Sequence, residues 1–95
     1  MPLFTVLAEY GGGAYLAQVR ARSARHAAAA WPESAALAEL ARLLELPLGS
    51  FRKGLRAPEV ERVRGLVGCW RAAADVGDQL LLLHIVETAE PPRRK

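Results

Sequence analysis

Cysteine is almost absent from this chain of 95 residues, since Cys69 is the only one. A single thiol excludes an internal disulfide and a cysteine-rich zinc site. Long hydrophobic runs are also missing, and the leucine run Leu80–Leu83 is far shorter than the roughly 20 residues that span a bilayer. Residues 1–4 lack the charged and apolar segments of a signal peptide. We therefore expect a soluble cytoplasmic protein with no membrane association.

The body of the chain also has no excess of positive or negative charge. Thirteen Lys and Arg against ten Asp and Glu give a net charge of +3, and residues 93–95 account for this excess. We expect residues 91–95 to be a disordered basic tail and residues 1–90 to be a single domain. Local clusters of basic residues remain, and nucleic acid or another anionic surface is the alternative partner that they indicate. The candidate anion-binding residues are Arg20, Arg22, Arg52, Lys53 and Arg56.

Three consecutive glycines, residues 11–13, separate two runs that alternate like strands, residues 3–9 and 15–22. A two-residue turn at Gly11-Gly12 places Phe4 opposite Val19 and makes one face of the pair entirely apolar. A three-residue turn mixes polar and apolar side chains on that face, so the buried pattern favours the shorter turn. Glycine at both turn positions suits the positive φ of a type I′ turn. The sequence therefore predicts an N-terminal β-hairpin.

A helical segment follows the hairpin. Ser23 is a typical N-cap for the alanine-rich residues 24–31, and Pro32 either kinks this helix or begins a second one that ends near Leu46-Pro47. Residues 47–65 hold so many Gly and Pro that we expect a connector, with at most one short helical turn from Pro58 to Arg64. The apolar residues at helical spacing are Ala24, Ala27, Ala28 and Trp31, and then Leu37, Leu40, Ala41 and Leu44.

Residues 67–74 and 79–87 predict a second strand pair. The run from Leu80 to Val86 is apolar on both faces apart from His84, which is typical of a central strand with both sides covered. The predicted fold class is α+β, with two β-hairpins in one antiparallel four-stranded sheet and one or two helices on one face. Helices can cover only one side of a sheet in so short a chain. The other side therefore needs a second copy of the chain or another protein.

The uncovered side of the sheet is the candidate partner-binding face. The register of the first hairpin separates the side chains that meet the helices from those that point away from them. We expect a homodimer or a complex with a protein partner on this face. The candidate contact residues are Leu3, Leu7, Leu16, Gln18 and Arg20.

Catalysis finds little support in the sequence. There is no HExxH motif, no P-loop and no dinucleotide fingerprint. Cys69 and His84 are the one pair that could suggest nucleophilic catalysis. A type I turn through Asp75-Val76 with a left-handed Gly77 sets Cys69 opposite Leu83, and the thiol and imidazole then point to opposite faces. We expect no enzyme, no cofactor and no metal.

The sequence resembles two groups of proteins, the first over most of the chain and the second over residues 4–31. Glu9-Tyr10, Gly12-Gly13-x-Tyr15 and Gln18-Val19, with Cys69-Trp70 and Ile85-Val86-Glu87-Thr88 further on, are similar to a group of short uncharacterised bacterial proteins. Residues 4–31 resemble the hairpin and helix of HicB-like antitoxins, although the usual Pro-Gly-Cys segment and a separate DNA-binding domain are missing. An antitoxin- or immunity-like role is what this resemblance implies. The residues themselves predict a small non-enzymatic protein-interaction module, with binding of nucleic acid or an anionic surface as the alternative.

Overall fold

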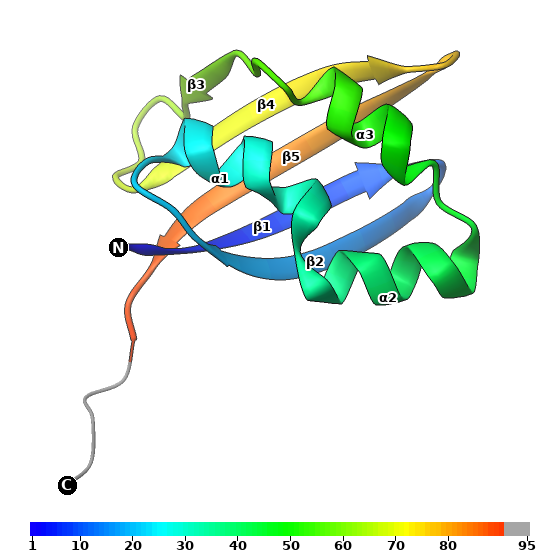
Figure 1. The fold of residues 1–95 in the computed structure, drawn as a ribbon. Coiled ribbons are helices and arrows are strands. Elements are labelled where there is room, and N and C mark those ends of the chain that lie inside the picture. The colour runs from blue at the N-terminus through cyan, green and yellow to red at the C-terminus, as the bar shows by residue number, and fades with distance from the viewer. Residues whose placement is uncertain (91–95) are drawn as a thin grey trace, which may run out of the picture.

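The computed structural model describes residues 1–90, and the predicted tail at 91–95 lies outside the described residues. Five strands form one antiparallel sheet in the order β2-β1-β5-β4-β3, and the helices lie on one side of it (Figure 1). The α+β class with one covered face is confirmed, but the sheet has five strands rather than four and the layer above it has three α-helices. The elements are β1 (Leu3–Tyr10), β2 (Gly13–Arg20), α1 (Ala24–Ala30), the 3₁₀ turn η1 (Trp31–Glu33), α2 (Ala35–Leu44), α3 (Leu48–Gly54), β3 (Val60–Arg62), β4 (Cys69–Val76) and β5 (Gln79–Thr88).

The first hairpin has the predicted register. Phe4 lies opposite Val19 across a two-residue turn, and both side chains are buried beneath the helices. Gly11 and Gly12 have φ of +59° and +82°, the left-handed conformation that a type I′ turn requires at both central positions. The third glycine of the triplet, Gly13, belongs to β2. The glycine cluster therefore reverses the chain.

Substitution of Gly12 by valine is expected to destabilise the fold by about 1–2 kcal/mol, because a β-branched residue resists the left-handed conformation. A Cβ atom at this position meets nothing within 4 Å, so the cost comes from the backbone and not from a clash. Gly12→Asn is the matched control, since Asn tolerates positive φ much better. Urea unfolding of the two variants measures the difference, and equal midpoints would contradict this explanation.

The helical layer begins as predicted and then departs from the prediction. Ser23 Oγ accepts a hydrogen bond from the His26 backbone N–H at 3.2 Å, which confirms the N-cap of α1. Pro32 lies in η1, and α2 has an N-cap of its own, because Ser34 Oγ accepts from the backbone N–H of Leu37 at 3.3 Å. Of the apolar residues predicted at helical spacing in α2, only the first is buried. Leu37 is 1% exposed, whereas Leu44 near the end of α2 is 54% exposed.

The segment expected to be a connector contains two elements. Helix α3 follows Pro47, and Phe51 on this helix is fully buried, with ring centroids 5.4 Å from Trp31 and 5.0 Å from Tyr10. Pro58 begins no helix, so that prediction is wrong. It precedes the short edge strand β3, a position that tolerates a residue without a backbone N–H. Tertiary contacts of Phe51 and of the buried Leu55 therefore stabilise a segment that local propensity describes as irregular.

The second hairpin turns two residues later than predicted. Its turn is Gly77-Asp78, and only Gly77 has a positive φ (+64°), the pattern of a type II′ turn. This turn lets Val76 remain in β4, where it is 3% exposed, while a turn through Val76 would remove that residue from the strand. Cys69 then lies opposite Val86, and it shares a face with His84. The prediction that Cys69 and His84 point to opposite faces is wrong for this reason.

Candidate interaction face

The register of the four long strands defines the surface that faces away from the helices, which we call the open face (Figure 1). All five residues predicted to contact a partner lie on it. Sequence analysis missed the contribution of the second hairpin, which the structure shows by burying Leu81, Leu83 and Ile85 on the helix side of β5. The open face consists of Leu3, Thr5, Leu7, Glu9, Ala14, Leu16, Gln18 and Arg20 from β1 and β2, and of Cys69, Arg71, Ala73, Asp75, Leu80, Leu82, His84, Val86 and Thr88 from β4 and β5.

Aliphatic side chains on the open face are exposed to solvent. Leu16 is 60%, Leu80 51% and Val86 43% exposed, and Leu7 and Leu82 are half-buried between them. These residues occupy three adjacent strands, β2, β1 and β5. Single exposed leucines are common on protein surfaces, but several on adjacent strands of one sheet face are typical of a contact surface.

Most polar groups on the open face already have partners within the chain. Thr5 Oγ1 lies 2.6 Å from Thr88 Oγ1 and accepts a hydrogen bond from Gln18 Nε2 at 3.1 Å. His84 Nε2 lies 3.7 Å from a carboxylate oxygen of Glu9. A partner that covers these groups therefore leaves their hydrogen bonds in place.

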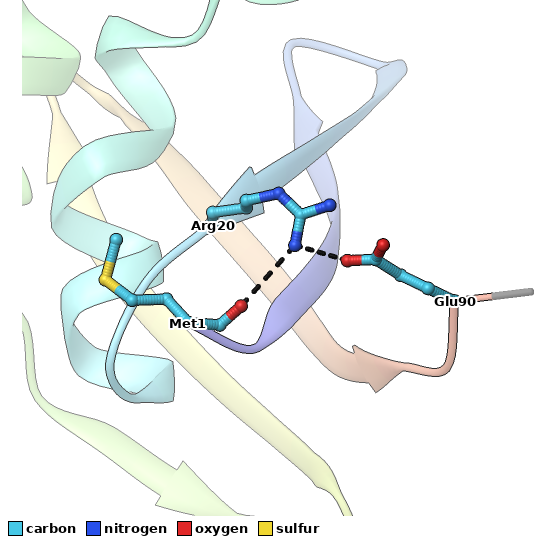
Figure 2. A network of polar contacts seen from close by, with 3 residues as sticks. All are labelled: Met1, Arg20 and Glu90. Carbon is cyan, nitrogen blue, oxygen red and sulfur yellow. Dashed lines mark hydrogen bonds and ion pairs between the residues drawn. The ribbon is translucent and has the colours of Figure 1, made fainter. Parts of the chain in front are cut away.

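Arg20 joins the two ends of the described chain (Figure 2). Its Nη1 donates to the backbone carbonyl of Met1 at 3.4 Å and forms an ion pair with the Glu90 carboxylate. The hydrogen bond from Arg20 holds the pKa of the Glu90 carboxyl below its usual value, and the same contact raises the pKa of Arg20. The carboxylate of Glu90 therefore already occupies the position at Arg20 where an anionic ligand would have to bind.

The other candidate anion-binding residues are distributed over the fold. Arg22 lies in the link between β2 and α1, Arg52 and Lys53 lie on α3, and Arg56 follows that helix. Arg52 Nε is engaged by a carboxylate oxygen of Glu33 at 2.6 Å. The structure thus places Arg20 on the open face and Arg52 and Lys53 in the helical layer on the opposite side of the sheet. It does not gather the five residues into one basic surface.

A shallow hollow of about 350 Å³ lies on the open face between β4 and β5. Ala73 and Leu82 form its floor, and Glu61, Arg71 and His84 border it. Arg71 Nε and Glu61 Oε2 lie 3.7 Å apart and form an ion pair at this border, where Glu59 is a further carboxylate. Because both floor residues are apolar, the hollow suits an aliphatic side chain.

Cys69 and His84 share the open face, but each is engaged elsewhere. The Cys69 thiol donates to the Val67 carbonyl at 3.7 Å, and His84 faces Glu9. Within residues 1–90, no group of three or more His, Cys, Asp and Glu side chains could hold a metal ion.

Comparison with protein-family models, with curated proteins and with solved structures gave no match to this chain. None of the helices in residues 1–90 has the length and apolar character needed to cross a membrane. The open face is therefore the feature from which a function can be inferred, since it combines exposed aliphatic side chains with polar groups that are internally paired.

Proposed function

We propose that this chain is a small non-enzymatic protein-interaction module that binds its partner through the open face. The observation that carries the proposal is the exposure of Leu16, Leu80 and Val86 on the side of the sheet that the helices leave uncovered. Removing such side chains from water contributes roughly 25 cal/mol per Å² of apolar surface. Polar groups on the same face keep their intramolecular partners, so their burial costs less than burial of unpaired groups.

An antitoxin- or immunity-like role is consistent with a module of this kind. A module that neutralises another protein by covering its functional surface needs a binding face but no catalytic group. The resemblance of residues 4–31 to HicB-like antitoxins supports the same proposal. A toxin or effector gene beside the gene for this chain, and loss of toxicity when the two are co-expressed, would be the expected results. Undiminished toxicity on co-expression would contradict the role.

Substitution Leu16→Glu is expected to weaken partner binding at least about 100-fold, because it places an unpaired carboxylate in an apolar contact. Its matched control is Leu44→Glu, which introduces the same charge at a similarly exposed leucine in the helical layer and is expected to bind normally. The measurement is affinity capture with each form as bait. It is followed by titration with the purified protein that is captured.

Two results would contradict the proposed function. One is equal binding by Leu16→Glu and wild type, with the circular dichroism spectra of both variants unchanged. The other is a nucleic-acid gel shift at low salt that weakens steeply as salt rises, since counterion release causes such a dependence. That second result would favour the alternative function through Arg22, Lys53 and Arg56. An apolar sheet contact holds or strengthens as salt rises.

A further inference from the structure

The open face is large enough to form a dimer interface with an identical face. Strands β2, β1, β5 and β4 each contain at least eight residues. With strands about 4.8 Å apart and a rise of about 3.4 Å per residue, these four cover about 19 by 27 Å, or roughly 500 Å² in projection. Two such faces together approach about 1,000 Å², the lower end of specific protein interfaces. An interface of this size is typical of a weak or transient dimer.

The open face has two charged pairs at its borders, and Glu9, His84 and Asp75 also lie on it. Arg71 is paired with Glu61 and Arg20 with Glu90, and both pairs lie at borders of the surface. The aliphatic residues lie between these borders, on both sides of the boundary between β1 and β5. An apolar centre with a polar rim is the usual anatomy of a protein interface.

A two-fold axis parallel to the strands and above the boundary between β1 and β5 makes the face self-complementary. Because the strand order is β2-β1-β5-β4, this axis places β1 of each copy over β5 of the other, and β2 over β4. Leu16 lies opposite Leu7, Leu7 opposite His84, and His84 opposite Arg71, so these residues form one row across the sheet. The axis therefore places Leu16 of one copy over Arg71 in the other, at the border of the hollow, whose Ala73 and Leu82 lie in the adjacent row.

We infer that the partner on the open face is a second copy of this chain, packed face to face so that Leu16 of each copy enters the Ala73–Leu82 hollow of the other. This inference rests on the proposed function and names its partner. Leu16 is the most exposed large aliphatic side chain of the face, and the row that the two-fold axis sets opposite it contains Arg71 and His84, which border the hollow of about 350 Å³. Residue i then contacts residue j and j contacts i, as a two-fold interface requires.

Light scattering coupled to gel filtration, from 1 to 200 µM, tests the inference. The wild-type chain is expected to approach twice its 10.3 kDa mass at the upper end. Leu16→Glu, Val86→Glu and Ala73→Trp, the last of which fills the hollow, are each expected to raise the dimer dissociation constant at least about 100-fold. Leu44→Glu is the matched control and is expected to remain dimeric. All four replaced side chains are exposed, so the monomer should fold in each case.

Each alternative outcome contradicts a stated part of the inference. A monomeric wild type at 200 µM overturns the second copy as partner, while the interaction function survives if a captured protein still distinguishes Leu16→Glu from Leu44→Glu. A dimer that withstands Val86→Glu and Ala73→Trp but not Leu16→Glu overturns face-to-face packing and indicates pairing of β2 edges. A dimer broken only by Leu44→Glu places the contact in the helical layer.

Discussion

Replacement of Trp31 by alanine is expected to lower the free energy of unfolding by about 3–5 kcal/mol, the usual cost of removing a buried tryptophan. Trp31 is fully buried at the junction of α1 and η1, and its ring lies 5.4 Å from that of Phe51 on α3. The residue therefore connects two segments of the helical layer. Chemical denaturation followed by circular dichroism measures the change. A loss below about 1 kcal/mol would contradict this anchoring role.

Trp31→Phe is the informative comparison. The indole Nε1 is the one buried side-chain nitrogen or oxygen in residues 1–90 that has no hydrogen-bond partner. A buried donor without a partner costs about 1–3 kcal/mol, and phenylalanine removes it while keeping most of the apolar contact. We expect this variant to lose at most about 2 kcal/mol. A loss as large as that of the alanine variant would mean that the nitrogen contributes to stability.

Phe51→Ala is expected to cost a similar amount, about 3–5 kcal/mol, although Phe51 lies in a segment with little helix propensity. Its ring lies between those of Tyr10 and Trp31 and is fully buried. Hydrogen exchange should show the amides of α3 losing protection before those of β5. Uniform loss of protection across both elements would contradict a local role.

The double variant of Trp31 and Phe51 should cost less than the two single variants together, because the rings contact one another and one substitution removes part of what the other would lose. Leu44→Ala is the control for the helical layer. This side chain is 54% exposed, so its loss is expected to change stability by less than about 0.5 kcal/mol. Strict additivity of the aromatic variants would contradict a direct coupling.

The first hairpin could be predicted in detail because its side chains differ strongly between the two faces. Phe4 and Val6 alternate with Thr5, and two glycines stand where positive φ is needed. Only one register gives an apolar face, and the structure has that register. The N-cap at Ser23 and the buried alanines of α1 follow from equally local rules.

The second hairpin and the segment before it could not be predicted as well. Strand β4 has alanine on both faces at residues 72–74, so its two faces do not differ in polarity there. The side-chain pattern therefore does not distinguish one turn position from another. Phe51 stabilises α3 through contacts with residues distant in the sequence, and β3 forms only because β4 lies beside it. These elements depend on tertiary contacts that override local propensity.

The part of the candidate site that lies on the first hairpin was predictable from the alternation of its side chains. The five predicted residues share the open face because the register of the first hairpin was correct. Leu80, Leu82 and Val86 were not named as contacts, since a strand that is apolar on both faces does not show which side a helix covers. The hollow above Ala73 depends on the pairing of β4 with β5, which was predicted with the wrong register.

The contact of Arg20 with Met1 and Glu90 has a practical consequence for constructing fusions of this protein. Leu3 pairs with Thr88, so β1 and β5 are neighbours, and both ends of residues 1–90 lie close together beside Arg20 (Figure 2). A short linker could join these ends, and the chain could be opened at the solvent-exposed Gly11-Gly12 turn, to give a circular permutant with the same strand order. A protein fused before Met1 or after Glu90 would leave from the border of the open face.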